Sequence, residues 1–224
     1  MRLRRLGRKG NNMAQNVLII GGSGNGKSAS LRNFKDELFI VNVIDKSLPF
    51  RNDFKNILAT DDYAKIKAKM LGAVEYGLKT IVIDDSGYLI MNQFMRGQGT
   101  KKGNAVFELY NQIASNFWDL INFVKYDLPN DVIVYFVMHE DIDDMGNVKP
   151  MTIGKLLNDK INIQGMFTIV FRAMKNDGKY IFRTQSSGLD IAKTPMGMFD
   201  SESIDNDLKV INDTIREYEN MEEK

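Results

Sequence analysis

The stretch from Leu18 to Ser28, LIIGGSGNGKS, restricts the possible folds of this chain more than any other feature of its sequence. Gly21 to Ser28 matches the pattern G-x-x-x-x-G-K-[ST] in full, directly after an apolar run. Glycines allow backbone conformations that other residues avoid, so successive N–H groups can turn inward and surround an anion. The pattern therefore predicts a phosphate-binding loop between a buried strand and a helix.

The residues of this loop have distinct predicted roles. Lys27 would reach the outer phosphates of a nucleotide, and the Ser28 hydroxyl would bind Mg²⁺. A glycine-rich turn that ends in Gly-Lys-Ser by chance is the alternative, and the strand-like run before the motif argues against it. The expected nucleotide-binding residues are Gly21, Gly22, Ser23, Gly24, Asn25, Gly26, Lys27, Ser28 and Ala29.

Two acidic residues end a second apolar run, in the segment TIVIDD from Thr80 to Asp85. Because parallel strands end at the same edge of a sheet, these carboxylates are expected beside the phosphate loop. Asp84 is assigned to the Mg²⁺ site, and Asp85 is the candidate general base that orients an attacking water. The alternative role for Asp85 is a helix cap, since DDSG also begins a polar turn.

Apolar runs that suit strands alternate with segments of helical periodicity along most of the chain. This alternation predicts an α/β fold with a mainly parallel sheet flanked by helices. Asp177-Gly178 lies between two apolar segments and predicts an antiparallel hairpin added to the sheet near the C-terminus. The expected strands are 16–20, 38–44, 80–83 and 132–138, and the expected helices are 27–35, 61–76, 105–125 and an amphipathic one over 204–218.

Composition excludes several kinds of site and partner. Without cysteine, the chain has no disulfide, thiolate metal site or cysteine nucleophile. It shows no secretory signal and no apolar run long enough for a membrane span, so a cytoplasmic protein without a membrane partner is expected. Five cations lie in the first nine residues, and the net charge of +1 becomes about −4 without them. We therefore expect a basic extension over 1–13 and one domain over 14–224 that is not a basic nucleic-acid platform.

The sequence also bears on the identity of the nucleotide. Guanine-specific proteins carry an N-K-x-D segment, which this chain lacks, so ATP with Mg²⁺ is expected. Small-molecule nucleotide kinases usually carry an Asp-Arg pair near the acceptor site, and the chain has no such dipeptide. The only histidine, His139, follows the fourth expected strand, where it is either a sensor of the γ-phosphate or an ordinary structural histidine.

Further segments carry a family resemblance: NVIDKSLPFR, IVIDDSGYLIMNQFMR, VIVYFVMHED, TIGKLLNDKINIQGMFTIVFR and RTQSSGLDIAKTPMGMF. With the phosphate loop, they resemble phage-encoded ATP-binding proteins with a RecA-like core, the group that contains the Sak-four type single-strand annealing proteins. The resemblance covers Ala14 to Tyr218. It implies a RecA-like P-loop NTPase core, single-stranded DNA as a ligand, and a role in phage recombination or replication by annealing.

By analogy with RecA-like proteins, two polar loops are candidates for DNA contact. The stretch from Arg96 to Asn104 is expected to be a mobile loop in which Arg96, Lys101 and Lys102 contact phosphates. Lys149 and Lys155 flank the second loop, although its aspartates oppose contact with a polyanion. The alternative for both segments is a plain solvated loop.

RecA-like ATPases commonly complete their site with a cation from a neighbouring subunit, which stabilises charge in the transition state. A homo-oligomer is therefore expected, and the candidate cations are Lys193 and Arg183, followed by Arg172. A single-strand DNA-binding protein or another phage replication or recombination protein is a further expected partner. The alternatives are a nucleotide-gated adaptor that loads a helicase or recombinase, and a degenerate ATPase without turnover.

We expect the Lys27→Ala variant to lose ATP binding or turnover while keeping its fold, because the lysine ammonium neutralises the outer phosphates. The measurement is phosphate release, together with a circular dichroism spectrum that reports folding. Unchanged hydrolysis in the folded variant would contradict the phosphate-loop assignment.

Overall fold

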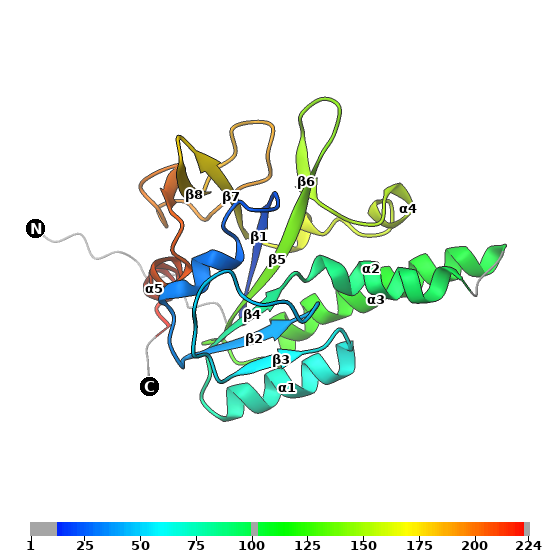
Figure 1. Ribbon diagram of the computed structural model, residues 1–224, viewed down its shortest axis with the longest axis horizontal. Coiled ribbons are helices and arrows are strands. Elements are labelled where there is room, and N and C mark those ends of the chain that lie inside the picture. The colour runs from blue at the N-terminus through cyan, green and yellow to red at the C-terminus, as the bar shows by residue number, and fades with distance from the viewer. Residues whose placement is uncertain (1–12, 100–102, 222–224) are drawn as a thin grey trace, which may run out of the picture.

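The computed structural model describes residues 13–99 and 103–221, and within them nine strands form one sheet (Figure 1). The strand order is β3-β2-β4-β5-β1-β7-β8-β9, and β6 pairs with the far end of β5. The basic extension predicted over 1–13 lies outside the described residues except for Met13. The strands are β1 Gln15–Gly21, β2 Leu38–Asn42, β3 Ile57–Ala59, β4 Thr80–Asp84, β5 Ile133–Ile142, β6 Val148–Pro150, β7 Ile169–Asn176, β8 Lys179–Arg183 and β9 Ser203–Asp205.

The sheet is parallel from β3 to β7 and antiparallel at its other end. β1 lies between β5 and β7 and pairs with both in parallel, while β4 is separated from β1 by β5. β7 and β8 form the predicted hairpin around Asp177 and Gly178, which have φ angles of 48° and 79°. The expected α/β fold, a mainly parallel sheet flanked by helices with an added hairpin, is confirmed.

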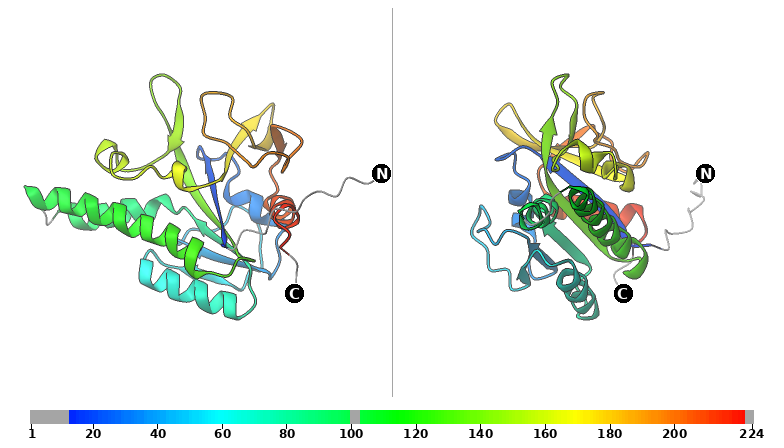
Figure 2. Two further views of the ribbon diagram at one scale, coloured as in Figure 1. Left: turned by 180° about the vertical axis from the view of Figure 1, so that it is seen from behind. Right: turned by 90° about the vertical axis from the view of Figure 1, so that its right-hand side faces the viewer.

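Helices cover both faces of the sheet (Figure 2). Successive β1 residues point to opposite faces, because side chains alternate along a strand. The helices are η1 Ser28–Asn33, α1 Tyr63–Glu75, α2 Gly87–Gln98, α3 Asn104–Asp127, α4 Lys155–Asn158, η2 Gln164–Met166 and α5 Leu208–Tyr218. Leu18 and Ile20 join the core under α1, α2 and α3, and Val17 and Ile19 join the core under η1 and α5. None of them, within the described ranges, is long and apolar enough to cross a lipid bilayer.

The prediction of a mobile loop over 96–104 is wrong for residues 96–98, because α2 continues to Gln98. Helix α3 then begins at Asn104. The two helices pack side by side and project from the sheet (Figure 1). A Cβ atom on Gly97 would lie 2.5 Å from Leu109 Cδ1, so the glycine lets the helices approach closely. In this segment a glycine serves helix packing rather than mobility.

The helix predicted over 27–35 is instead the short 3-10 helix η1, six residues long. Leu31 and Phe34 are both buried in the core on this face of the sheet. Phe34 reaches that core in an extended conformation, with a ψ angle of 158°, and this ends the helix. Burial of one aromatic side chain therefore outweighs the helical periodicity of the segment.

The last parallel strand of the predicted set is longer than the sequence suggested. β5 continues through His139 to Ile142 and pairs antiparallel with β6, so His139 lies within a strand rather than after it. The three-residue strands β3, β6 and β9 were not predicted, because so short a segment carries no recognisable alternation of polar and apolar residues.

Candidate nucleotide-binding site

The glycine-rich loop begins where β1 ends, at the carboxyl edge of the parallel sheet. Gly21 pairs with His139 of β5 on one side and with Ala173 of β7 on the other. Gly24 and Gly26 have φ angles of 78° and 86°, in the left-handed region that favours glycine. Two of the four glycines are therefore required by the backbone path of the loop itself.

Gly21 is required for a different reason, the close approach of two strands. A Cβ atom at this position would lie 2.5 Å from the carbonyl oxygen of Ala173 and 3.1 Å from its Cβ. A backbone oxygen cannot move aside without displacing β7. The first glycine of the motif thus fixes how closely the loop is held against the sheet.

Lys27 turns back over the loop and is almost completely buried, with 6% of its surface exposed. Its Nζ donates hydrogen bonds of 2.8 Å to the carbonyl oxygens of Gly21 and Gly22. Burial lowers the pKa of the Lys27 ammonium, against the opposing charges of Asp85 and Asp84. The positive group is thus held inside the loop, where an anion would be bound.

Ser28 and Asp84 meet across the site although they are 56 residues apart in the chain. The Ser28 Oγ donates to Asp84 Oδ1 at 3.0 Å, and Asp84 is buried, at 1% exposure. Burial, followed by the charge of Asp85, raises the pKa of the Asp84 carboxyl. A hydroxyl and a carboxylate are the oxygen ligands that Mg²⁺ accepts, so this pair fits the predicted metal role.

Asp85 lies beside Asp84 and contacts a lysine and the histidine. Its carboxylate contacts Lys46 Nζ, and its Oδ1 lies 3.4 Å from His139 Nε2. Burial raises its pKa, but the hydrogen bonds from His139 and Lys46 outweigh burial and leave the pKa of Asp85 below its usual value. Asp85 has a left-handed backbone, with φ 56°, and Ser86 holds the N-cap position of α2. The side chain of Asp85 therefore faces the site rather than capping that helix.

Lys46 is a site residue that the sequence analysis did not single out. It follows β2, whose carboxyl end lies at the same edge as the phosphate loop. Burial lowers its pKa, but the hydrogen bond and charge of Asp85 prevail, so the pKa of Lys46 is raised. Its place just after a parallel strand, in the segment NVIDK, is the signal that could have identified it.

His139 connects the two halves of the site. Its Nε2 faces Asp85, and its Nδ1 lies 3.5 Å from Lys27 Nζ. A ring that carries its proton on Nε2 can donate to Asp85 and accept from Lys27, so one tautomer satisfies both neighbours. The ring also packs edge-on against Tyr88, with centroids 6.2 Å apart. This position suits the predicted sensor, which remains a prediction.

The three predicted trans-acting cations all have partners within this chain. Arg172 Nε donates to Glu140 Oε2 at 2.8 Å, and Arg183 Nη2 lies 3.9 Å from Glu202 Oε2. Lys193 Nζ donates to the carbonyl oxygen of Gln164 at 3.2 Å. A role for any of them in a neighbouring subunit would first require these contacts to be exchanged.

The predicted DNA contacts are only partly within the described residues. Arg96 lies on α2, where its Nη1 donates to Asp61 Oδ2 at 2.6 Å, and its side chain is 60% exposed. Lys101 and Lys102 lie outside the described residues. The guanidinium of Arg96 is thus bound to a carboxylate of its own chain instead of standing free in a loop.

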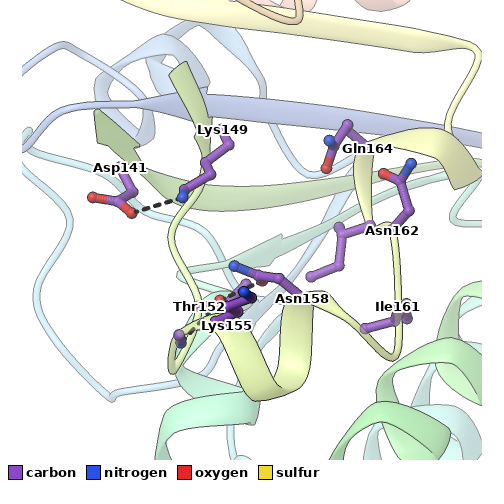
Figure 3. Close-up of a pocket in the computed structure, with 10 residues that line it drawn as sticks. Asp141, Lys149, Thr152, Lys155, Asn158, Ile161, Asn162 and Gln164 are labelled. Carbon is purple, nitrogen blue, oxygen red and sulfur yellow. Dashed lines mark hydrogen bonds and ion pairs between the residues drawn. The ribbon is translucent and has the colours of Figure 1, made fainter. Parts of the chain in front are cut away.

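The second polar loop borders a cavity of about 530 Å³ between β6, α4 and η2 (Figure 3). Lys149 and Lys155 both line it, and Lys149 Nζ is 3.6 Å from Asp141 Oδ2. Figure 3 shows the amide side chains of Asn162 and Gln164 on the opposite side of this cavity from Asp141. The lining does not include the Gly21–Ser28 loop, so this cavity is separate from the candidate nucleotide-binding site.

No family model matches this sequence, and no curated protein matches it. One solved structure to which the chain is similar is a prototypical ATPase from the type III secretion system of pathogenic bacteria. The two share 11% identity with a TM-score of 0.47, over 74% of this chain and 52% of the other. This chain therefore spans about half the length of that ATPase.

We expect Gly21→Ala to destabilise the fold by about 1–3 kcal/mol, the usual cost of inserting a methyl group into a packed site. The free energy of unfolding in urea measures the loss. Gly72→Ala is the matched control, because Gly72 lies in α1 and its Cβ would meet no atom within 4 Å. Equal stability of the two variants would show that β1 and β7 are not held together closely at Gly21.

Proposed function

We propose that this protein binds ATP with Mg²⁺ in the Gly21–Ser28 loop and hydrolyses it. One observation carries the proposal: the Lys27 ammonium, the Ser28 hydroxyl and two buried carboxylates meet at one edge of the sheet. Two segments of the chain, 56 residues apart, supply these groups. A structural turn would need none of them, because buried charges cost free energy unless they are paired.

The donor set fits the expected ligand. Among the described residues, Lys27 Nζ contacts two loop carbonyl oxygens and the nearby imidazole. Phosphate oxygens can replace those carbonyls as acceptors, with the gain of a charge-assisted hydrogen bond. Ser28 and Asp84 would hold Mg²⁺, which when bound offsets negative charge on the phosphates.

The hydrolysis reaction gives a role to the remaining side chains of the site. Asp85 is the group that would accept a hydrogen bond, and then the proton, from the water that attacks the γ-phosphorus. A bond forms between the water oxygen and phosphorus, the bond to the bridging oxygen breaks, and ADP and inorganic phosphate leave. Phosphoryl transfer depends mainly on position and charge, so a carboxylate kept ionised by Lys46 and His139 suits the task.

Single-stranded DNA is the proposed ligand on the strength of the family resemblance alone. Annealing in phage recombination or replication is the corresponding biological role. The nucleotide-gated adaptor is the second candidate, and it is favoured by the ion pair that engages Arg96 and by the net charge of about −4 outside the first nine residues. The two candidates differ in whether DNA changes turnover.

We expect Asp85→Asn to bind ATP near wild-type affinity and to hydrolyse it about 100-fold to 10,000-fold more slowly, as loss of a general base requires. Calorimetry measures the binding and phosphate release measures the turnover. Asp213→Asn, an exposed change on α5, is the control. Normal turnover in Asp85→Asn would reduce Asp85 to an ion-pair partner of Lys46 and His139.

We expect single-stranded DNA to stimulate ATP hydrolysis, and its affinity to fall steeply as salt rises, because protein cations displace counterions from phosphates. Hydrolysis with and without an oligonucleotide, and binding of a labelled strand across a salt series, measure both effects. An ATP hydrolysis rate that DNA does not change, together with no salt-dependent binding of the labelled strand, would favour the adaptor.

A further inference from the structure

Asn206, between β9 and α5, is a buried residue whose side-chain amide has no hydrogen-bond partner among the described residues. It is 3% exposed, and neither its Nδ2 nor its Oδ1 has a hydrogen-bond partner among the described residues. Buried amides are nearly always satisfied, since an unpaired one loses its bonds to water and gains none in return. The unpaired amide can therefore bind a ligand that offers both an acceptor and a donor.

The Asn206 amide faces the phosphate loop. A Cβ atom on Gly26 would lie 3.2 Å from both its Nδ2 and its Oδ1. The backbone of Asn206 is tied to the same place, because Arg32 Nη1 donates to its carbonyl oxygen at 2.6 Å and to that of Ala29 at 3.1 Å. The amide therefore lies beside the Gly26–Ala29 end of the loop.

This end of the loop is where a nucleoside would emerge. In a loop of this pattern the lysine reaches the outer phosphates, and the amides cradle the inner ones. Lys27, His139 and the Asp84–Asp85 pair all lie toward β4 and β5. The sugar and base must then leave on the other side, toward η1, β8 and β9.

Tyr180 of β8 offers an aromatic ring at the same point. Its Cδ1 would lie 3.0 Å from a Cβ on Gly26, and 45% of the residue is exposed. The Asn206 backbone N–H donates to the Tyr180 carbonyl oxygen at 3.3 Å, which keeps the two residues together. Lys175 Nζ lies 5.3 Å from the ring centroid. A partly exposed ring next to a buried free amide has the composition of a base-binding subsite.

We propose that Tyr180 and Asn206 bind the base of the nucleotide and select adenine, an inference that rests on the proposed nucleotide site. The Tyr180 ring stacks on the base, and rotation of this exposed side chain uncovers the Asn206 amide. A carboxamide matches the adjacent donor and acceptor of adenine, the 6-amino group and a ring nitrogen. Glycine at position 26 leaves the space that this contact needs.

The first test compares Mg²⁺-ATP with Mg²⁺-tripolyphosphate by calorimetry, because tripolyphosphate has no base. Wild-type protein should bind ATP at least tenfold more tightly. Tyr180→Ala should weaken ATP about tenfold, the usual effect of removing a stacking ring, and leave tripolyphosphate unchanged. Tyr180→Phe keeps the ring and should keep ATP affinity, and Tyr126→Ala, an exposed tyrosine on α3, is the matched control.

The second test exchanges the amide for a carboxylate with Asn206→Asp. A carboxylate only accepts, so it cannot pair with adenine in the same way, whereas guanine offers two adjacent N–H donors. The ratio of ATP to GTP affinity should therefore fall at least tenfold. Because the ratio is measured within one folded protein, a general weakening by the added charge does not affect it.

The outcomes separate this inference from the proposed function. Equal affinity for ATP and tripolyphosphate in the wild type would overturn the base subsite while leaving the phosphate loop intact. An ATP to GTP ratio unchanged by Asn206→Asp, or an equal loss of both ligands in Tyr180→Ala, would also overturn it. Failure to bind either ligand would overturn the proposed function, and the subsite with it.

Discussion

Four charged side chains, Lys27, Lys46, Asp84 and Asp85, are gathered at the carboxyl edge of the sheet, and the rest of the site depends on how they are paired. A buried charge is tolerated only where opposite charges and hydrogen bonds compensate its loss of water. Asp85 is compensated by Lys46 and His139, and Asp84 by the Ser28 hydroxyl. Within the described residues Lys27 forms no ion pair and contacts loop carbonyls and the imidazole, so its ammonium can exchange these contacts for an anion.

The strand order determines which groups can meet. β5 lies between the loop strand β1 and the acidic strand β4, so its residue His139 comes between Lys27 and Asp85. On the other side of β1, the antiparallel end of the sheet brings Tyr180 and Asn206 against Gly26. The two sides of the loop thus face different chemistry, with charges toward β4 and an aromatic ring with an amide toward β8.

Prediction from sequence succeeded where a segment carries its own signal. Strands β1, β2, β4 and β5 and helix α3 have apolar patterns of their own, and Asp177-Gly178 marks the hairpin turn. It failed where a distant contact overrides the local pattern. Helix η1 is short because the Phe34 ring is buried in the core. Gly97 lies within helix α2 because Leu109 of α3 packs against it. The sequence next to Phe34 and Gly97 does not indicate that the core or α3 will contact these residues.

The sequence by itself determined the glycine-rich loop after a buried strand, the need for glycine at its left-handed positions, and the acidic pair that ends another buried strand, because each is a property of neighbouring residues. Tertiary structure alone decided that Lys46 pairs with Asp85, that Arg96 is held by Asp61, and that the Asn206 amide faces Gly26. These pairs join residues far apart in the chain. Their meeting depends on strand order and helix packing, which no local pattern encodes.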